Sequence, residues 1–83
     1  MATAVTVPRL GDEMRSAILI RFLVPVGASV QRGEPLYELD TDKVTQEVEA
    51  EAEGVLLRVD AEEGGEYQVG ATLAWIGSEG ESP

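Results

Sequence analysis

The feature that most constrains the fold of this 83-residue chain is an internal repeat at an offset of 37 residues. When residues 17–40 are set above residues 54–77, apolar residues and glycines coincide. The matched pairs include Ile18 with Val55, Arg21 with Arg58, Gly27 with Gly64, Gln31 with Gln68, Gly33 with Gly70 and Leu39 with Ile76. A chain that repeats itself in this way is predicted to fold as two matching halves related by an approximate two-fold axis.

Within each half, the apolar segments are short and are separated by Gly, Pro and acidic residues, a pattern that predicts strands. No stretch sustains a helical period for three turns, so the chain is expected to be all-β. The expected strands are 4–8, 17–23, 29–30, 35–39, 44–49, 54–59, 67–68 and 72–76. We expect two four-stranded antiparallel sheets packed face to face, a flattened β-barrel or barrel-sandwich hybrid with pseudo-two-fold symmetry.

Alternation along the strands predicts which side chains face the core, and glycines predict the turns. With Arg21 and Arg58 facing water, the residues expected to point inward are Ile18, Ile20, Phe22, Val55, Leu57 and Val59. Turns are expected at Gly27, Gly33, Gly64 and Gly70, because positive φ costs glycine little.

The composition argues against several classes of function. The chain has no His and no Cys, so the commonest general base and thiol nucleophile are missing and a free-standing enzyme is not expected. A net charge of −10 opposes binding to nucleic acid and to anionic membranes. The longest apolar run is broken by Arg21 and the N-terminus has no signal core, so a cytoplasmic protein is expected.

We expect one domain over residues 1–77 and the start of a flexible linker over 78–83.

Lys43 is the only lysine of the chain, and it lies in the junction between the two repeats. That junction is the symmetry mate of the place where the chain ends meet, so Lys43 is expected at a hairpin tip far from the termini. A lone primary amine in this position predicts a point of covalent attachment. An ordinary exposed turn lysine is the alternative, and the carboxylates on both sides of Lys43 count against it. A calcium loop through Asp40 and Asp42 is not expected, because Lys43 and Val44 stand where further ligands and a glycine are needed.

Several motifs resemble those of the lipoyl domain in the dihydrolipoyl acyltransferase component of a 2-oxo acid dehydrogenase complex. The segment 7–12 resembles the family's Pro-x-Leu-Gly-acidic opening, and the segment 27–33 resembles its Gly-x-x-Val-x-x-Gly turn. The segment 39–44 resembles the Glu-Thr-Asp-Lys-Ala motif around the modified lysine. Gly54 and the run 69–73 also match, so the resemblance covers residues 5–76. The departures are Asp40 for Glu, Val44 for Ala, and Ser16-Ala17, preceded by Arg15, for Glu-Gly in an early loop.

The resemblance implies a swinging-arm carrier without catalytic residues of its own. Lipoic acid would be joined to Lys43 as an amide by a lipoate ligase or lipoyl transferase, with Asp42 and Val44 as flanking recognition residues. The arm would carry acyl groups and electrons between a thiamine-diphosphate-dependent 2-oxo acid decarboxylase, the acyltransferase core domain and dihydrolipoyl dehydrogenase. Recognition of these partners is expected to involve Asp40, Thr41, Arg15 and Ser16. The isolated domain is expected to be a monomer. Because the chain has no thiol, all disulfide exchange must come from the cofactor.

Three alternatives share some of these features. A biotin carrier domain also modifies a hairpin lysine, but that family flanks the lysine with methionines, whereas Asp42 and Val44 stand here. The lipoyl carrier of the glycine-cleavage system is longer and has extra helical segments. An unmodified barrel-sandwich domain serving as an adaptor or structural module is the alternative from another class, since fold does not fix function.

Overall fold

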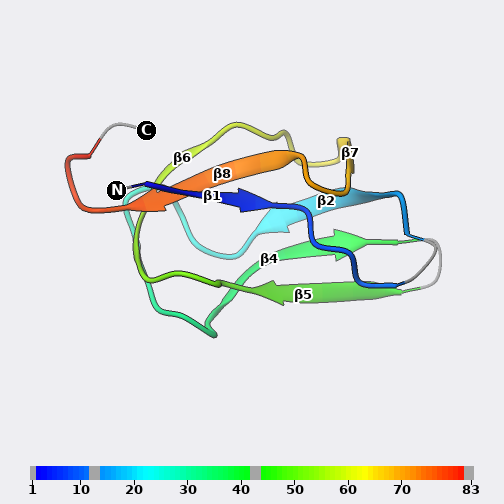
Figure 1. Ribbon diagram of the computed structural model, residues 1–83, viewed down its shortest axis with the longest axis horizontal. Helices are drawn as coiled ribbons and strands as arrows, with labels where there is room; N and C mark the ends of the chain where they lie inside the picture. The colour runs from blue at the N-terminus through cyan, green and yellow to red at the C-terminus, as the bar shows by residue number, and fades with distance from the viewer. Residues whose placement is uncertain (1, 12–13, 42–43, 82–83) are drawn as a thin grey trace.

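The computed structural model describes residues 2–11, 14–41 and 44–81, and their regular structure consists of eight strands. These are β1 (Thr3–Thr6), β2 (Ser16–Phe22), β3 (Ser29–Val30), β4 (Pro35–Asp40), β5 (Thr45–Glu49), β6 (Gly54–Val59), β7 (Glu66–Gln68) and β8 (Thr72–Gly77). Sheet A has the order β1-β8-β6-β3 and sheet B the order β5-β4-β2-β7, and every strand pair is antiparallel. Figure 1 shows the two sheets stacked as a sandwich, so the predicted fold class is confirmed.

The strand registers of the two sheets repeat at the offset seen in the sequence. In sheet B, Leu19 pairs with Leu39 and, across a bulge, Arg21 pairs with Glu38. In sheet A, 37 residues later, Leu56 pairs with Ile76 and, across a bulge, Arg58 pairs with Trp75. The two halves therefore share strand positions, pairing and bulges, which is the predicted two-fold relation.

A thin apolar core lies between the sheets. Its buried members among the described residues are Val7, Ala17, Leu19, Val30, Leu36, Tyr37, Leu39, Ala50, Leu56, Leu73, Ala74 and Ile76. The Tyr37 ring packs against Phe22 with 5.4 Å between ring centroids, and the Tyr37 hydroxyl donates to the Thr6 carbonyl at 3.2 Å. Burial, with a smaller contribution from the charge of Glu51, raises the pKa of the Tyr37 hydroxyl. The hydroxyl therefore remains a donor and joins β4 to the end of β1.

Because of the bulges, four side chains point in a different direction from the one predicted. Ile18 is exposed, and Ile20, Val55 and Leu57 are only half-buried, so the prediction that they point into the core was wrong. The inward residues at these places are Ala17, Leu19 and Leu56. Each bulge inserts one residue and shifts the alternation by one position. Beyond the bulges the prediction is confirmed, because Arg21 and Arg58 are exposed while Phe22 and Val59 pack against the core.

The chain termini and the β4–β5 turn lie at opposite ends of the molecule (Figure 1), whose extents are 37 × 20 × 20 Å. The glycine turns at the expected positions 27, 33, 64 and 70 all have positive φ. After β8 the chain makes a further turn, in which Glu81 N–H donates to the Ser78 carbonyl and Ser78 N–H donates to Glu81 Oε1, both at 2.9 Å. Among the described residues there is no helix of the length and hydropathy needed to cross a membrane.

We predict that Gly54→Ala destabilises the domain much more than Gly64→Ala. Both glycines have positive φ, but a Cβ on Gly54 would lie 2.5 Å from the Gly77 carbonyl oxygen, whereas a Cβ on Gly64 would meet nothing within 4 Å. Backbone strain alone costs about 1–2 kcal/mol, so we expect Gly54→Ala to lower the free energy of unfolding by ~3 kcal/mol or more. Urea unfolding of the two variants measures the difference, and equal losses would contradict the close packing of β6 on β8.

Candidate functional site

The β4–β5 turn is closed by hydrogen bonds between Thr41 and Val44. Asp40 pairs with Thr45 as the last register pair of the two strands. Beyond it, Thr41 N–H and Thr41 Oγ1 donate to the Val44 carbonyl at 2.9 and 3.1 Å, and Val44 N–H lies 3.4 Å from Thr41 Oγ1. Asp42 and Lys43, expected as recognition and attachment residues, lie outside the described residues. The structure therefore fixes the residues that flank the expected attachment point on both sides.

These flanking residues lie at an open end of the sandwich. Val44 is half exposed, and Asp40 and Thr41 are half-buried at the end of β4. The short side chain of Thr41 bonds to nearby backbone, which is the reason Thr and Asp favour turns. Thr41, expected to take part in partner recognition, thus uses its hydroxyl within the turn itself.

Arg15 and Ser16 lie at the same end of the molecule as the turn. Ile18 of β2 pairs with Asp40 of β4, so the residues just before Ile18 extend toward the turn end of sheet B. Ser16 Oγ donates to Glu66 Oε2 at 2.6 Å, while the Arg15 side chain is exposed and its carbonyl accepts from Val69 N–H at 2.9 Å. The structure therefore brings the described members of the expected recognition set to one end.

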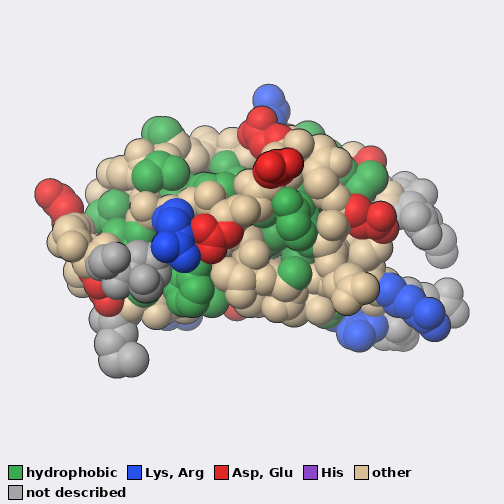
Figure 2. Space-filling view, turned by 90° about the horizontal axis from the view of Figure 1, so that it is seen from above, with side chains coloured by type: hydrophobic (Ala, Val, Ile, Leu, Met, Phe, Trp, Pro, Cys, Tyr) green, Lys and Arg blue, Asp and Glu red, His purple; other side chains and the backbone are tan. Residues whose placement is uncertain are grey.

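The connection between β1 and β2 reaches the same end (Figure 1) and is folded around Met14. Arg9 Nη1 donates to the Met14 carbonyl at 2.9 Å, Leu10 N–H donates to Met14 Sδ at 3.2 Å, and Met14 N–H donates to the Gly11 carbonyl at 3.1 Å. Figure 2 shows arginine side chains at this end of the face that it presents, as well as elsewhere on that face. Leu10 is exposed there, so apolar and basic groups border the turn from this side.

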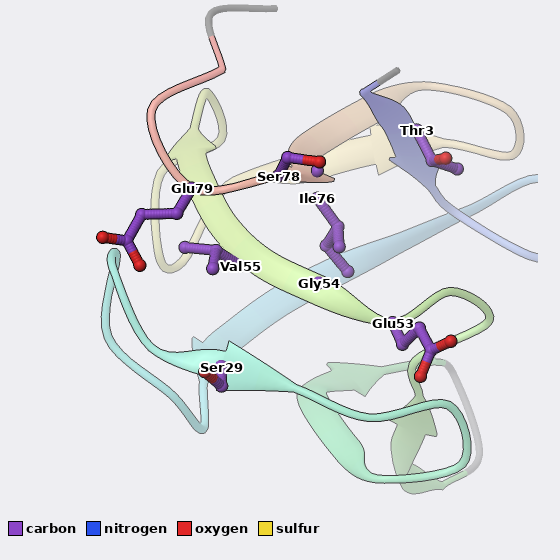
Figure 3. Close-up of a pocket in the computed structure, with 9 residues that line it drawn as sticks. Thr3, Ser29, Glu53, Gly54, Val55, Ile76, Ser78 and Glu79 are labelled. Carbon is purple, nitrogen blue, oxygen red and sulfur yellow. The ribbon is translucent and has the colours of Figure 1, made fainter.

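Two hollows of the described surface lie away from Thr41 and Val44. One, of about 420 Å³, lies beside the chain ends and is lined by Thr3, Ser29, Glu53, Gly54, Val55, Ile76, Gly77, Ser78 and Glu79 (Figure 3). Another, of about 180 Å³, lies between β1 and the end of β5. Neither is lined by Thr41 or Val44, so the described ends of the turn lie outside both hollows.

Among the described residues, the titratable groups with shifted pKa values also lie away from Thr41 and Val44. Hydrogen bonds from Arg58 and, to a smaller extent, Trp75 lower the pKa of Asp60. Arg58 Nε lies 2.7 Å from Asp60 Oδ1, and Trp75 Nε1 donates to Asp60 Oδ2 at 3.1 Å. The Tyr37 hydroxyl is buried in the core. Across the described ranges no group of three His, Cys, Asp or Glu side chains is arranged to hold a metal ion.

Fold and site together define a class of protein: a small β-sandwich in which hydrogen bonds between Thr41 and Val44 close an exposed turn between two strands. A family model described as "Biotin-requiring enzyme", which covers biotin and lipoyl domains, matches residues 3–76. The chain therefore belongs to the biotin/lipoyl domain family, and its relatives identify it as a lipoyl domain of the dihydrolipoyl acyltransferase type.

Two curated relatives show the similarity in sequence. The acetyltransferase component of the pyruvate dehydrogenase complex of Corynebacterium glutamicum is 39% identical over 83 residues, which are 100% of this chain and 12% of that protein. The succinyltransferase component of the 2-oxoglutarate dehydrogenase complex of Staphylococcus saprophyticus is 41% identical over 73 residues, which are 88% of this chain and 17% of that protein. The chain thus spans less than a fifth of either relative.

A solved structure shows the similarity in fold. The lipoyl domain of the 2-oxoglutarate dehydrogenase complex of Azotobacter vinelandii superimposes with a TM-score of 0.72 at 27% identity. The match covers 89% of this chain and 94% of that domain. The expectation of a lipoyl domain is therefore confirmed at the level of the whole domain.

We predict that Thr41→Val loosens the turn and that Thr41→Ser leaves it closed. Valine keeps the branched shape but removes the hydroxyl that donates to the Val44 carbonyl, a bond worth about 0.5–1.5 kcal/mol. Amide hydrogen exchange at Thr41, whose N–H donates to the same carbonyl, is expected to rise about tenfold in Thr41→Val and to remain near wild type in Thr41→Ser. Equal exchange in both variants would show that the hydroxyl does not hold the turn.

Proposed function

We propose that this chain is a swinging-arm carrier domain in which lipoic acid is joined to Lys43 as an amide. The observation that carries the proposal is the closed, exposed turn between Thr41 and Val44, in a domain whose relatives are lipoyl-bearing acyltransferase components. Lys43 is the only side-chain amine of the sequence and stands between these two residues.

In the proposed attachment, the lone pair of the neutral Lys43 amine attacks the carbonyl carbon of an activated lipoyl group. The activating group leaves with the bonding electron pair, and the nitrogen loses its extra proton, so that an amide forms and one positive charge disappears. The bound group supplies disulfide and thiol chemistry that a chain without Cys does not have. The four-carbon stem of Lys43 gives the arm its first flexible bonds.

The residues around Lys43 have separate proposed roles. Thr41 holds the turn in shape, because its hydroxyl and N–H bond to the Val44 carbonyl. Asp42 and Val44 are recognised by the lipoate ligase or lipoyl transferase as the immediate neighbours of the amine. Asp40, Arg15 and Ser16 contribute to recognition of protein partners, since β2 pairs with the end of β4.

We further propose that the domain is the carrier part of a dihydrolipoyl acyltransferase in the cytosol and is monomeric when isolated. Its partners would be the thiamine-diphosphate-dependent decarboxylase, the acyltransferase core domain and dihydrolipoyl dehydrogenase. The carrier unit would end with β8, whose end lies opposite the turn, and residues 78–83 would begin a linker. Tethering from that end would raise the effective concentration of the arm at each active site.

We predict that the intact mass rises by one lipoyl group after incubation with a lipoate ligase, lipoate and ATP, because Lys43 offers the reacting amine. Lys43→Arg, which keeps the positive charge and has no acylable primary amine, is expected to show no gain. Incubation with biotin, its ligase and ATP is the matched arm, and no biotinyl gain is expected. An unmodified wild-type mass with lipoate, or a gain with biotin alone, would overturn the proposal.

A further inference from the structure

A row of side chains crosses sheet B at the end that holds the β4–β5 turn. Ile18 of β2 lies at its centre, paired with Glu66 of β7 on one side and with Asp40 of β4 on the other. Asp40 in turn pairs with Thr45 of β5. Ile18 is 41% exposed although β2 is an inner strand of the sheet. We call these four residues the Ile18 row: an exposed apolar side chain between two carboxylates.

The internal repeat provides a comparison within the same molecule. At the corresponding place in sheet A, Val55 pairs with Ser29 on one side and with Gly77 on the other. Figure 3 shows Ser29 and Val55 beside the hollow near the chain ends, far from the turn. The fold therefore needs neither an exposed isoleucine nor flanking carboxylates at this position, and the features of the Ile18 row call for another explanation.

The carboxylates of the row are not neutralised within the described part of the chain. Arg21 pairs with Glu38 and Arg58 with Asp60, both at 2.7 Å. Glu66 accepts a hydrogen bond from Ser16 Oγ, which orients it without cancelling its charge. Neither Asp40 nor Glu66 forms an ion pair with a described arginine. The row thus has an apolar centre and two carboxylates that no described arginine pairs with.

We propose that the Ile18 row is the docking surface for the enzyme that attaches the lipoyl group, and this inference rests on the proposed function. Before attachment, the reacting atom is the Lys43 amine on its own four-carbon stem, so the attaching enzyme must come up to the turn itself. Asp40 is three residues from Lys43, a stretch of at most about 11 Å. Enzymes that use the finished arm can dock farther away.

The charge of the row fits this occupant. An enzyme that activates a carboxylic acid through a phosphate-bearing intermediate needs cationic side chains around its active site, and a negative row close to the amine is attracted to them. Ile18 would enter an apolar recess between those cations. Burying the exposed part of one such side chain strengthens binding about tenfold.

The test measures KM and kcat for lipoylation of the full chain with a lipoate ligase, lipoate and ATP. Ile18→Ala is expected to raise KM about tenfold with kcat nearly unchanged, and Glu66→Arg to raise KM by a similar factor and to reduce its dependence on salt. The matched controls are Val55→Ala, at the corresponding place in the repeat, and Glu53→Arg, an equal change of net charge beside the far hollow. Both controls are expected to leave KM within about twofold of wild type.

The outcomes separate this inference from the proposed function. A wild-type chain that is not lipoylated overturns the proposed function. If the wild-type chain is lipoylated on Lys43 but KM is unchanged in both Ile18→Ala and Glu66→Arg, the docking surface alone is overturned. The docking surface is also overturned if the two control variants raise KM as much as these two variants do. If the variants lower the rate of reductive acylation by the decarboxylase and leave lipoylation unchanged, the row belongs to the decarboxylase interface, and the proposal is also overturned. Thermal unfolding within a few degrees of wild type confirms that each variant is folded.

Discussion

The structure depends on the packing of two short sheets across a single apolar layer. Leu19 and Leu56, at equivalent places in the repeat, are fully buried in this layer, and each immediately precedes a bulge. The bulges bend the central strands, so that Phe22 and Val59 can follow Leu19 and Leu56 into the core at a spacing of three residues. Losing one such leucine typically costs about 2–5 kcal/mol, which is a large share of the stability of a domain of this size.

The same two-fold arrangement determines where the β4–β5 turn lies. The pseudo-two-fold axis relates the junction between the repeats to the place where the chain ends meet. These two places lie at opposite ends of the molecule. A carrier needs this separation, because the attached group must move freely while the domain is tethered. The hydrogen bonds between Thr41 and Val44 close the described ends of the turn, and neither of the two hollows is lined by these residues.

Most of the fold could be predicted from the sequence, because the internal repeat shows the same pattern of strands and turns twice. All eight strands lie within two residues of their expected ranges, and the glycine turns lie where they were expected. The direction of the Ile18 side chain could not be predicted, because residues 17–20 are all apolar. In such a run, a bulge does not change the pattern of apolar and polar residues. The strand order could not be predicted either. Ser16 lies at the same end of sheet B as Asp40 because β2 pairs with β4, and sequence spacing does not specify that pairing.

Digestion with trypsin is the most direct measurement of attachment at Lys43. Within residues 33–58 the only basic residues are Lys43 and the terminal Arg58, so digestion after incubation with lipoate and its ligase reports on one side chain. An amide at Lys43 blocks cleavage there, and mass spectrometry is expected to find a single peptide over residues 33–58 that carries one lipoyl group. Unmodified peptides over residues 33–43 and 44–58, with the lipoyl group elsewhere or absent, would contradict the account.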